Sequence, residues 1–139
     1  MKPFEYYLRE NQVKKQPIDK NLAKSLVDQA LRRLDYVNKI EINEINRDFI
    51  LEDYYEVMRT LADAVLALNG YKSYSHEAPI AFLERYKEFS TSLIENFDRI
   101  RKLRHGSRYY GERTSLSDAK TARELAKTIV PKLRQILKM

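Results

Sequence analysis

Apolar side chains recur every three or four residues in four long segments of the chain. This spacing places them along one face of an α-helix, and it predicts helices near residues 19–42, 48–69, 76–105 and 115–137. A shorter helix is expected within residues 3–10. The third segment has the most regular stripe, which consists of Phe82, Tyr86, Phe89, Leu93, Phe97, Ile100 and Leu103.

Residues that favour helix ends fall near the ends of these segments. Asp19 can cap the start of the first helix, and Ser115 with Asp118 resembles a capping box before the last one. Gly70 follows the second segment as a C-cap signal. Gly106 offers a place where the third helix can bend or stop.

Each segment is apolar on one stripe only, so each must bury that stripe against the others. Short connections between such helices predict an all-α fold, an antiparallel up-and-down bundle of four to five helices. The length of 139 residues indicates a single domain over residues 1–139. Pro131 lies inside the last segment and is expected to kink that helix or to end its first part.

Composition limits the possible functions only broadly. The chain has no cysteine, which excludes disulfides and thiolate metal sites, and its net charge of +6 permits contact with nucleic acid or phosphate without requiring it. The N-terminus does not resemble a secretory signal, and no apolar run approaches the ~18 residues of a membrane span. We therefore expect a cytoplasmic protein without a membrane partner.

The stretch FDRIRKLRHGSRYYGERTS, residues 97–115, holds six of the 26 basic residues. The simplest interpretation is a solvated helix end, where cations interact favourably with the helix dipole. The alternative is a site for RNA or nucleotide, because arginine binds phosphate, histidine transfers protons near neutral pH and tyrosine stacks on bases. The candidates are Arg99, Arg101, Arg104, His105, Arg108, Tyr109 and Tyr110.

We expect this stretch to form a basic, partly exposed surface near the end of the third helix. Unpaired guanidinium groups are too costly to bury, so the arginines should not all face the core. Arg104 is expected to pair with Asp98 or Glu112, and charge reversal at Arg101 and Arg104 together should cost little stability.

At these residues, and in the phrase GYKSYSHEA at 70–78, the sequence resembles the HEPN domain family (higher eukaryotes and prokaryotes nucleotide-binding). The family motif is an Arg followed, after four to six residues, by a His near the end of a late helix. The resemblance implies a helical bundle that binds RNA or nucleotide, commonly as a homodimer, and in active members a metal-independent endoribonuclease without cofactor. It also implies a minimal nucleotidyltransferase as a possible partner of a toxin-type protein.

The motif fits this chain in two registers, and the sequence leaves both open. In the first, Arg99 is the motif arginine and His105 the catalytic histidine. In the second, Arg104 is the motif arginine, and His105 is the residue after it, which in the family is often Asn, Asp or His. The position of the catalytic histidine then falls on Tyr109. Tyrosine, with a reference pKa near ~10, is a poor base at neutral pH. The second register therefore implies a degenerate, phosphate-binding member that is weakly catalytic or inactive.

The remaining candidates have simpler explanations. His76 is expected to be an exposed first-turn residue, and the two histidines make no metal site by themselves. The acidic residues of the second segment are expected to form a solvated face, and they are Glu52, Asp53, Glu56 and Asp63. Two functions thus stand: a binding module for RNA, nucleotide or a nucleotidyltransferase, and a ribonuclease that uses His105 with Arg99.

Overall fold

The computed structural model describes residues 1–139 and is mostly helical. It contains six α-helices, and they are α1 (Phe4–Arg9), α2 (Lys20–Asn38), α3 (Arg47–Leu68), α4 (Ala78–Phe82), α5 (Thr91–Tyr110) and α6 (Leu116–Leu137). A 3-10 turn, η1 (Leu83–Arg85), follows α4. Two short strands complete the fold, β1 (Val13–Lys15) and β2 (Tyr71–Ser73).

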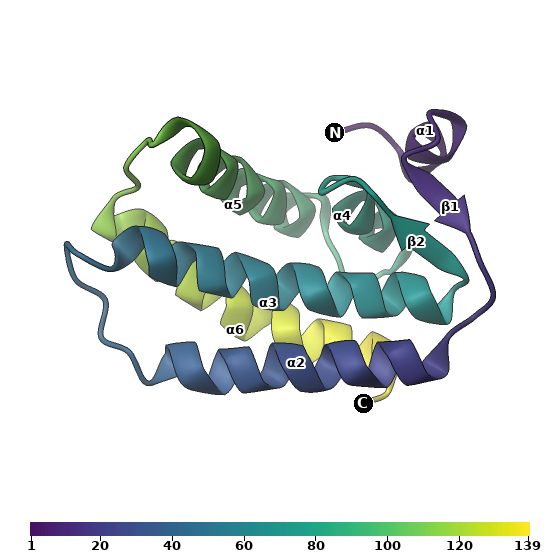
Figure 1. Ribbon diagram of the computed structural model, residues 1–139, viewed down its shortest axis with the longest axis horizontal. Coiled ribbons are helices and arrows are strands. Elements are labelled where there is room, and N and C mark those ends of the chain that lie inside the picture. The colour runs from purple at the N-terminus through teal and green to yellow at the C-terminus, as the bar shows by residue number, and fades with distance from the viewer.

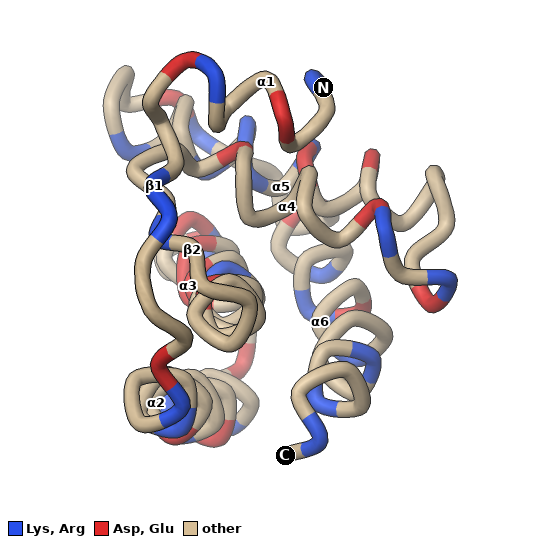
Figure 2. Tube along the Cα trace, turned by 90° about the vertical axis from the view of Figure 1, so that its right-hand side faces the viewer, with Lys and Arg blue, Asp and Glu red and all other residues tan.

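The four long helices form an up-and-down bundle around α3. Figure 1 shows α3 at the centre with α2 below it, α6 behind it and α5 above, and the end view in Figure 2 places α3 between α2 and α5. Most residues of α3 are buried, which a central helix requires. The predicted all-α bundle agrees with this architecture, to which the structure adds the short helix α4, the 3-10 turn and a small sheet.

Several helix ends lie where the sequence signals predicted them. The backbone N–H of Leu22 donates to Asp19 at 2.9 Å, and Ser115 and Asp118 form both bonds of the capping box. Gly70 follows α3 with a φ of +78°, a left-handed conformation that glycine adopts without strain. These signals are local, so the sequence was sufficient to recognise them.

The predicted helix 76–105 is wrong, because two helices share its apolar stripe. After η1 the chain becomes extended at Tyr86, with φ −97° and ψ 130°. Ser90 then caps a new helix, α5, by accepting from the N–H of Leu93 at 3.1 Å. Both parts bury their apolar side chains in the same core, which explains why the spacing resembled one helix.

Neither Gly106 nor Pro131 ends its helix. The helix α5 continues through Gly106 to Tyr110, and Gly111 ends it with a φ of +66°. The helix α6 likewise continues through Pro131 to Leu137, so the proline does not end it. None of the helices combines the length and the apolarity that a membrane crossing needs.

An antiparallel ribbon that was not predicted joins β1 to β2 beside the end of α3 (Figure 1). Its register pairs Val13 with Ser73 and Lys14 with Lys72. The predicted short helix near residues 3–10 is confirmed as α1. Its Phe4 ring packs edge-on against the Phe82 ring, with 4.8 Å between the ring centroids. The ribbon and α1 thereby hold the N-terminal segment against one end of the bundle.

Candidate functional site

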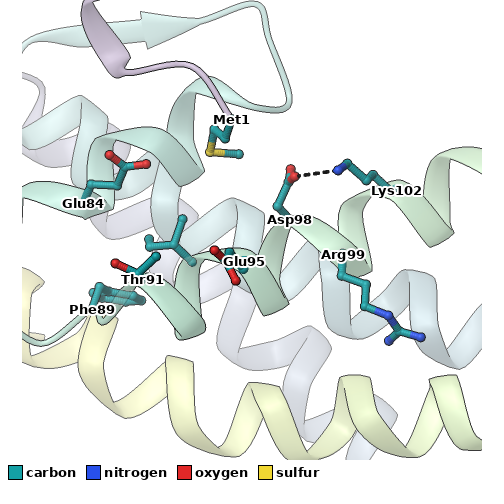
Figure 3. A pocket seen from close by; sticks show the side chains of 9 residues that line it. Met1, Glu84, Phe89, Thr91, Glu95, Asp98, Arg99 and Lys102 are labelled. Atoms are coloured by element: carbon teal, nitrogen blue, oxygen red, sulfur yellow. Dashed lines mark ion pairs between the residues drawn. The ribbon is translucent and has the colours of Figure 1, made fainter.

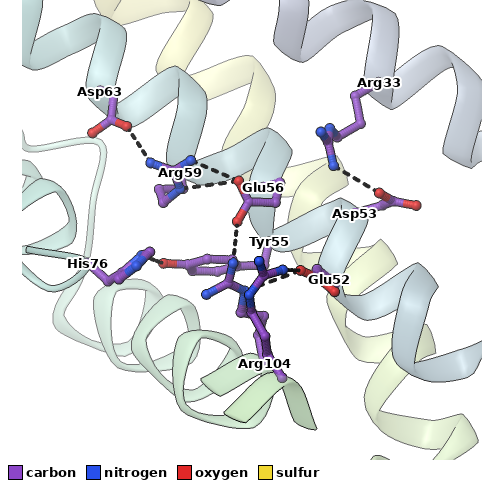
Figure 4. Close-up of polar contacts among 10 residues, drawn as sticks. Arg33, Glu52, Asp53, Tyr55, Glu56, Arg59, Asp63, His76 and Arg104 are labelled. Carbon is purple, nitrogen blue, oxygen red and sulfur yellow. Dashed lines mark hydrogen bonds and ion pairs between the residues drawn. The ribbon is translucent and has the colours of Figure 1, made fainter. Parts of the chain in front are cut away.

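The buried arginine of the basic stretch is Arg104, whose side chain is only 9% exposed. Its Nη2 lies 3.1 Å from a carboxylate oxygen of Glu56, and its Nε lies 3.6 Å from Glu52 (Figure 4). The guanidinium also lies 5.4 Å from the centroid of the Tyr55 ring. The expectation of a partly exposed Arg104 that pairs with Asp98 or Glu112 is therefore wrong. Carboxylates of α3 compensate the buried charge instead.

A row of charged side chains on α3 supplies these partners. Glu56, Arg59 and Asp63 are three and four residues apart, so they share one face of the helix. Arg59 donates to both carboxylates at 2.8 Å, which makes a continuous chain of charges from Arg104 to Asp63 (Figure 4). The solvated face expected here is wrong, since the Glu56 side chain is 13% exposed. Burial raises the pKa of Asp63 to about 6 against the opposing effect of Arg59.

Arg101 is half-buried and links α5 to the loop before α4. Its Nε donates to Asp98 at 2.7 Å, and its Nη1 lies 3.9 Å from Glu77. Glu77 also accepts from the hydroxyl of Tyr7 at 2.9 Å. Burial, with the carboxylate of Glu77 as the next cause, raises the pKa of Tyr7 to about 12. These contacts fix the loop 74–77 against α5.

A cavity of about 240 Å³ lies between this loop and α5, and both histidines of the chain line it. The hydroxyl of the buried Tyr55 lies 3.1 Å from Nδ1 of His76 (Figure 4). Partial burial lowers the pKa of His76, and the positive charges of Arg59 and Arg104 lower it further. Other residues of the lining are Tyr74, Arg101, Arg104 and His105.

His76 had been expected to lie in the first turn of a helix, and that expectation is wrong. The residue precedes α4, in a loop that brings its ring to the edge of the cavity. It remains exposed on its outer side. The phrase GYKSYSHEA was the one sequence signal that pointed to this loop.

The end of α5 carries an exposed cluster of aromatic and basic side chains. The His105 ring lies 4.8 Å from the Tyr109 ring and 5.6 Å from the Tyr110 ring. Tyr109 is 55% and Tyr110 70% exposed. Arg108 donates to Glu52 at 2.7 Å but remains half-exposed. Arg104 lies 6.0 Å from the Tyr109 ring, so the residues of the second register are neighbours.

Arg99 lies on a different side of α5 from His105. They are six positions apart in the sequence, which corresponds to about 120° around the helix axis and a rise of about 9 Å. Arg99 donates to Asp118 of α6 at 3.0 Å. It lines another cavity, of about 550 Å³, together with Met1 and Lys102 (Figure 3). The structure thus does not bring the two residues of the first register into one site.

The loop after α5 is held by one carboxylate. Asp48 accepts from the backbone N–H and the hydroxyl of Thr114 and from Nε of Arg113, each at 2.7 Å. Although burial alone would raise the pKa of Asp48, these hydrogen bonds lower it below its usual value. The N–H of Glu112 also donates to the carbonyl of Gly106 at 3.2 Å. The loop 111–115 is therefore fixed to the start of α3.

The charged residues of this region pair with one another and do not converge as metal ligands. No group of three or more His, Asp or Glu side chains in the chain is placed to hold a metal ion. What the region offers chemically is two imidazoles at one cavity, two arginines behind them and exposed tyrosine rings beside them.

Comparison with known proteins identifies the family. The model of the HEPN domain matches residues 23–136, which include all of α3 and α5, most of α2 and α6, and the cavity residues of α5. No curated protein and no solved structure matches the chain. The match covers most of the 139 residues, and the chain therefore belongs to the HEPN domain family.

Proposed function

We propose that this HEPN protein binds RNA or a nucleotide at the end of α5 and does not cleave it. The observation that carries the proposal is the position of Tyr109. It stands fifth after Arg104, where the second register places the catalytic histidine, and its ring lies against His105.

Two features of the cluster argue against cleavage. The phenol of tyrosine, with a reference pKa near ~10, holds its proton at neutral pH and is a poor general base. The Arg104 guanidinium is bonded to Glu56 and lies close to Glu52. It could reach a scissile phosphate only by leaving a buried carboxylate without its partner, which is costly.

The same cluster suits binding. Tyr109 and Tyr110 present exposed rings on which bases can stack. Arg108 and His105 lie beside these rings, and the half-exposed guanidinium of Arg108 can donate to a phosphate. A single strand would therefore meet stacking surfaces and a cation at one end of the bundle.

The experiment combines binding with cleavage on one substrate, a short unstructured RNA with a fluorescent label in the presence of a chelator. We expect binding that weakens as salt rises, because bound phosphates displace counterions. We expect no cleavage. The double variant Arg108→Gln/Tyr109→Leu should bind at least tenfold more weakly, since loss of a stacked base alone is worth about 1–3 kcal/mol. Absence of binding by the wild-type protein would refute the proposal.

One observation favours the ribonuclease alternative, namely that His76 and His105 line the same cavity. Two imidazoles can act as base and acid in cleavage through the RNA 2′-hydroxyl. This arrangement differs from the pair His105 and Arg99, whose members lie on different sides of α5. Chelator-resistant cleavage that both His76→Ala and His105→Ala abolish would establish the alternative and overturn the proposal of a non-cleaving protein.

The partner proposals rest on the family. We propose a homodimer, supported by apolar side chains exposed near the α5 end, where Ile45 is 83% and Phe49 65% exposed. Such side chains are typical of interface cores. A minimal nucleotidyltransferase is proposed as a further partner. Light scattering at high protein concentration tests the dimer. Co-purification after co-expression with a nucleotidyltransferase encoded by a neighbouring gene tests the second partner.

A further inference from the structure

The ribbon places two lysines opposite each other without any neutralising acid. Lys14 of β1 and Lys72 of β2 are direct cross-strand partners. Both side chains are exposed, and neither forms an ion pair, whereas most arginines of the cavity and of α5 do. Like charges directly opposite in a sheet are destabilising. No carboxylate offsets this repulsion between the two lysines.

An exposed aromatic ring lies between the two cations. Tyr74 follows Lys72 by two residues, so both side chains are on the same face of the extended segment. The ammonium groups of Lys14 and Lys72 each lie 5.6 Å from the centroid of the Tyr74 ring. The ring is 62% exposed. Single-stranded nucleic acid is bound by cations together with exposed aromatic rings, because the cations contact its phosphates and the rings stack on its bases.

The position of the ribbon connects it to the cavity of the histidines. Tyr74 lines that cavity together with His76 and His105. Lys14 and Lys15 also line a shallow hollow together with Arg9. Figure 2 shows the basic residues of β1 on the outside of the molecule, and the end of α5 lies beyond the cavity. The cavity lining therefore includes both Tyr74 beside the ribbon and His105 of the α5 cluster.

We propose that the β1–β2 ribbon is a second part of the RNA-binding surface. Tyr74 stacks one base, Lys14 and Lys72 bind the adjacent phosphates, and the strand continues past the histidine cavity to Tyr109 and Tyr110. This inference rests on the proposed function of the α5 cluster. An acidic protein segment would satisfy the lysines but would leave the ring of Tyr74 without a base to stack on, so single-stranded RNA is the better partner.

The first test measures the salt dependence of RNA binding for Lys14→Gln/Lys72→Gln. Each phosphate contact with a single strand contributes about 0.7 to the slope of log K against log salt concentration. Loss of two contacts should therefore reduce that slope by about 1.4. The control Lys120→Gln/Lys127→Gln removes the same charge from α6, on the far side of α3 from the ribbon (Figure 2), and should leave the slope unchanged.

The second test separates stacking from charge. Tyr74→Leu should weaken binding of oligouridine about tenfold, because a stacked base is lost. The same variant should bind an abasic ribose-phosphate oligomer as the wild type does. Circular dichroism should give the variants of Lys14, Lys72 and Tyr74 the wild-type helical signal, because the substituted residues lie outside the helices.

The outcomes distinguish the inference from the proposed function. If wild-type protein binds and Arg108→Gln/Tyr109→Leu weakens binding, but the ribbon variants bind like the wild type with an unchanged salt slope, the inference alone is overturned. If the ribbon lysines matter equally for polyglutamate and for RNA, the ribbon is a surface for acidic proteins and the inference is again overturned. If the wild type binds no RNA, both proposals fail.

Discussion

Arg104 of α5 donates to Glu56 of α3 at 3.1 Å, and this buried bond joins two helices whose residues are 48 positions apart in the sequence. Glu56 also accepts from Arg59, so one carboxylate holds two guanidinium groups. Arg104 therefore joins α5 to α3, although it lies in the basic stretch that the sequence indicated as a binding site. The cavity beside it is consequently lined by arginines that are already neutralised.

Replacement of Arg104 by methionine should destabilise the fold by about 3 kcal/mol. Breaking a buried ion pair costs about 3–5 kcal/mol, and the low end applies because Arg59 still neutralises Glu56. Urea unfolding measures the difference. Arg99→Met is the matched control, since the half-exposed pair with Asp118 should contribute less than about 1 kcal/mol. Equal, small effects of both substitutions would contradict a structural role for Arg104.

Tyr109→His should introduce slow, metal-independent RNA cleavage. It restores a histidine at the fifth position after Arg104, and a positioned general base or acid contributes about 10²–10⁴-fold. A product that ends in a 2′,3′-cyclic phosphate would identify attack by the RNA 2′-hydroxyl. Tyr110→His adds the same group one residue later and should remain inactive. Equal activity of both variants would argue against the second register.

His76 should titrate below the ordinary histidine pKa of about 6.5. Burial penalises its charged form, so the unfolded chain takes up the proton first as the pH falls through 6.5. The folded state therefore loses stability in that window. NMR titration of the two imidazoles, assigned with His105→Gln, measures the pKa. His76→Gln should remove this part of the pH dependence, and an unchanged stability curve would contradict the assignment.

Ionisation of the Asp63 carboxyl should lower the stability of the fold as the pH rises from about 4 to about 6. Its folded pKa of about 6 is above the unfolded value of 3.8, so the folded state binds more protons in that window and the penalty is complete above it. Urea midpoints of the wild type and Asp63→Asn should diverge across this range. The control Asp28→Asn replaces an exposed carboxylate on α2. The difference between its urea midpoint and that of the wild type should stay constant over this pH range.

Local patterns allowed the sequence to predict much of the bundle. The stripes of α2, α3 and α6, and the caps at Asp19 and Ser115, depend on neighbours within one or two turns. The break before α5 could not be predicted from spacing, because Phe82 of α4, Phe89 of the non-helical connection and Phe97 of α5 all reach the same core. Ser90 was the overlooked signal, a serine placed where it caps α5.

The candidate site depended on contacts between distant segments. The sequence indicated the chemistry of His105, Arg108 and the tyrosine pair, since these residues are adjacent. It could not indicate that Arg104 is buried, because this depends on Glu56 of α3. Nor could it place His76 beside His105, which requires the loop 74–77 to fold against α5.

The connectivity of the ribbon leads us to expect a particular order of folding. β1 precedes α2 and β2 follows α3, so the strands are close together only after those two helices have docked as a hairpin. Pairing across such a long loop carries an entropic cost that the earlier helix contacts must first offset. The bundle would thus collapse before the strands pair. Because Gln12 and Tyr74 belong to the ribbon segment and line the cavity, the cavity would be the last region to acquire its native shape during folding.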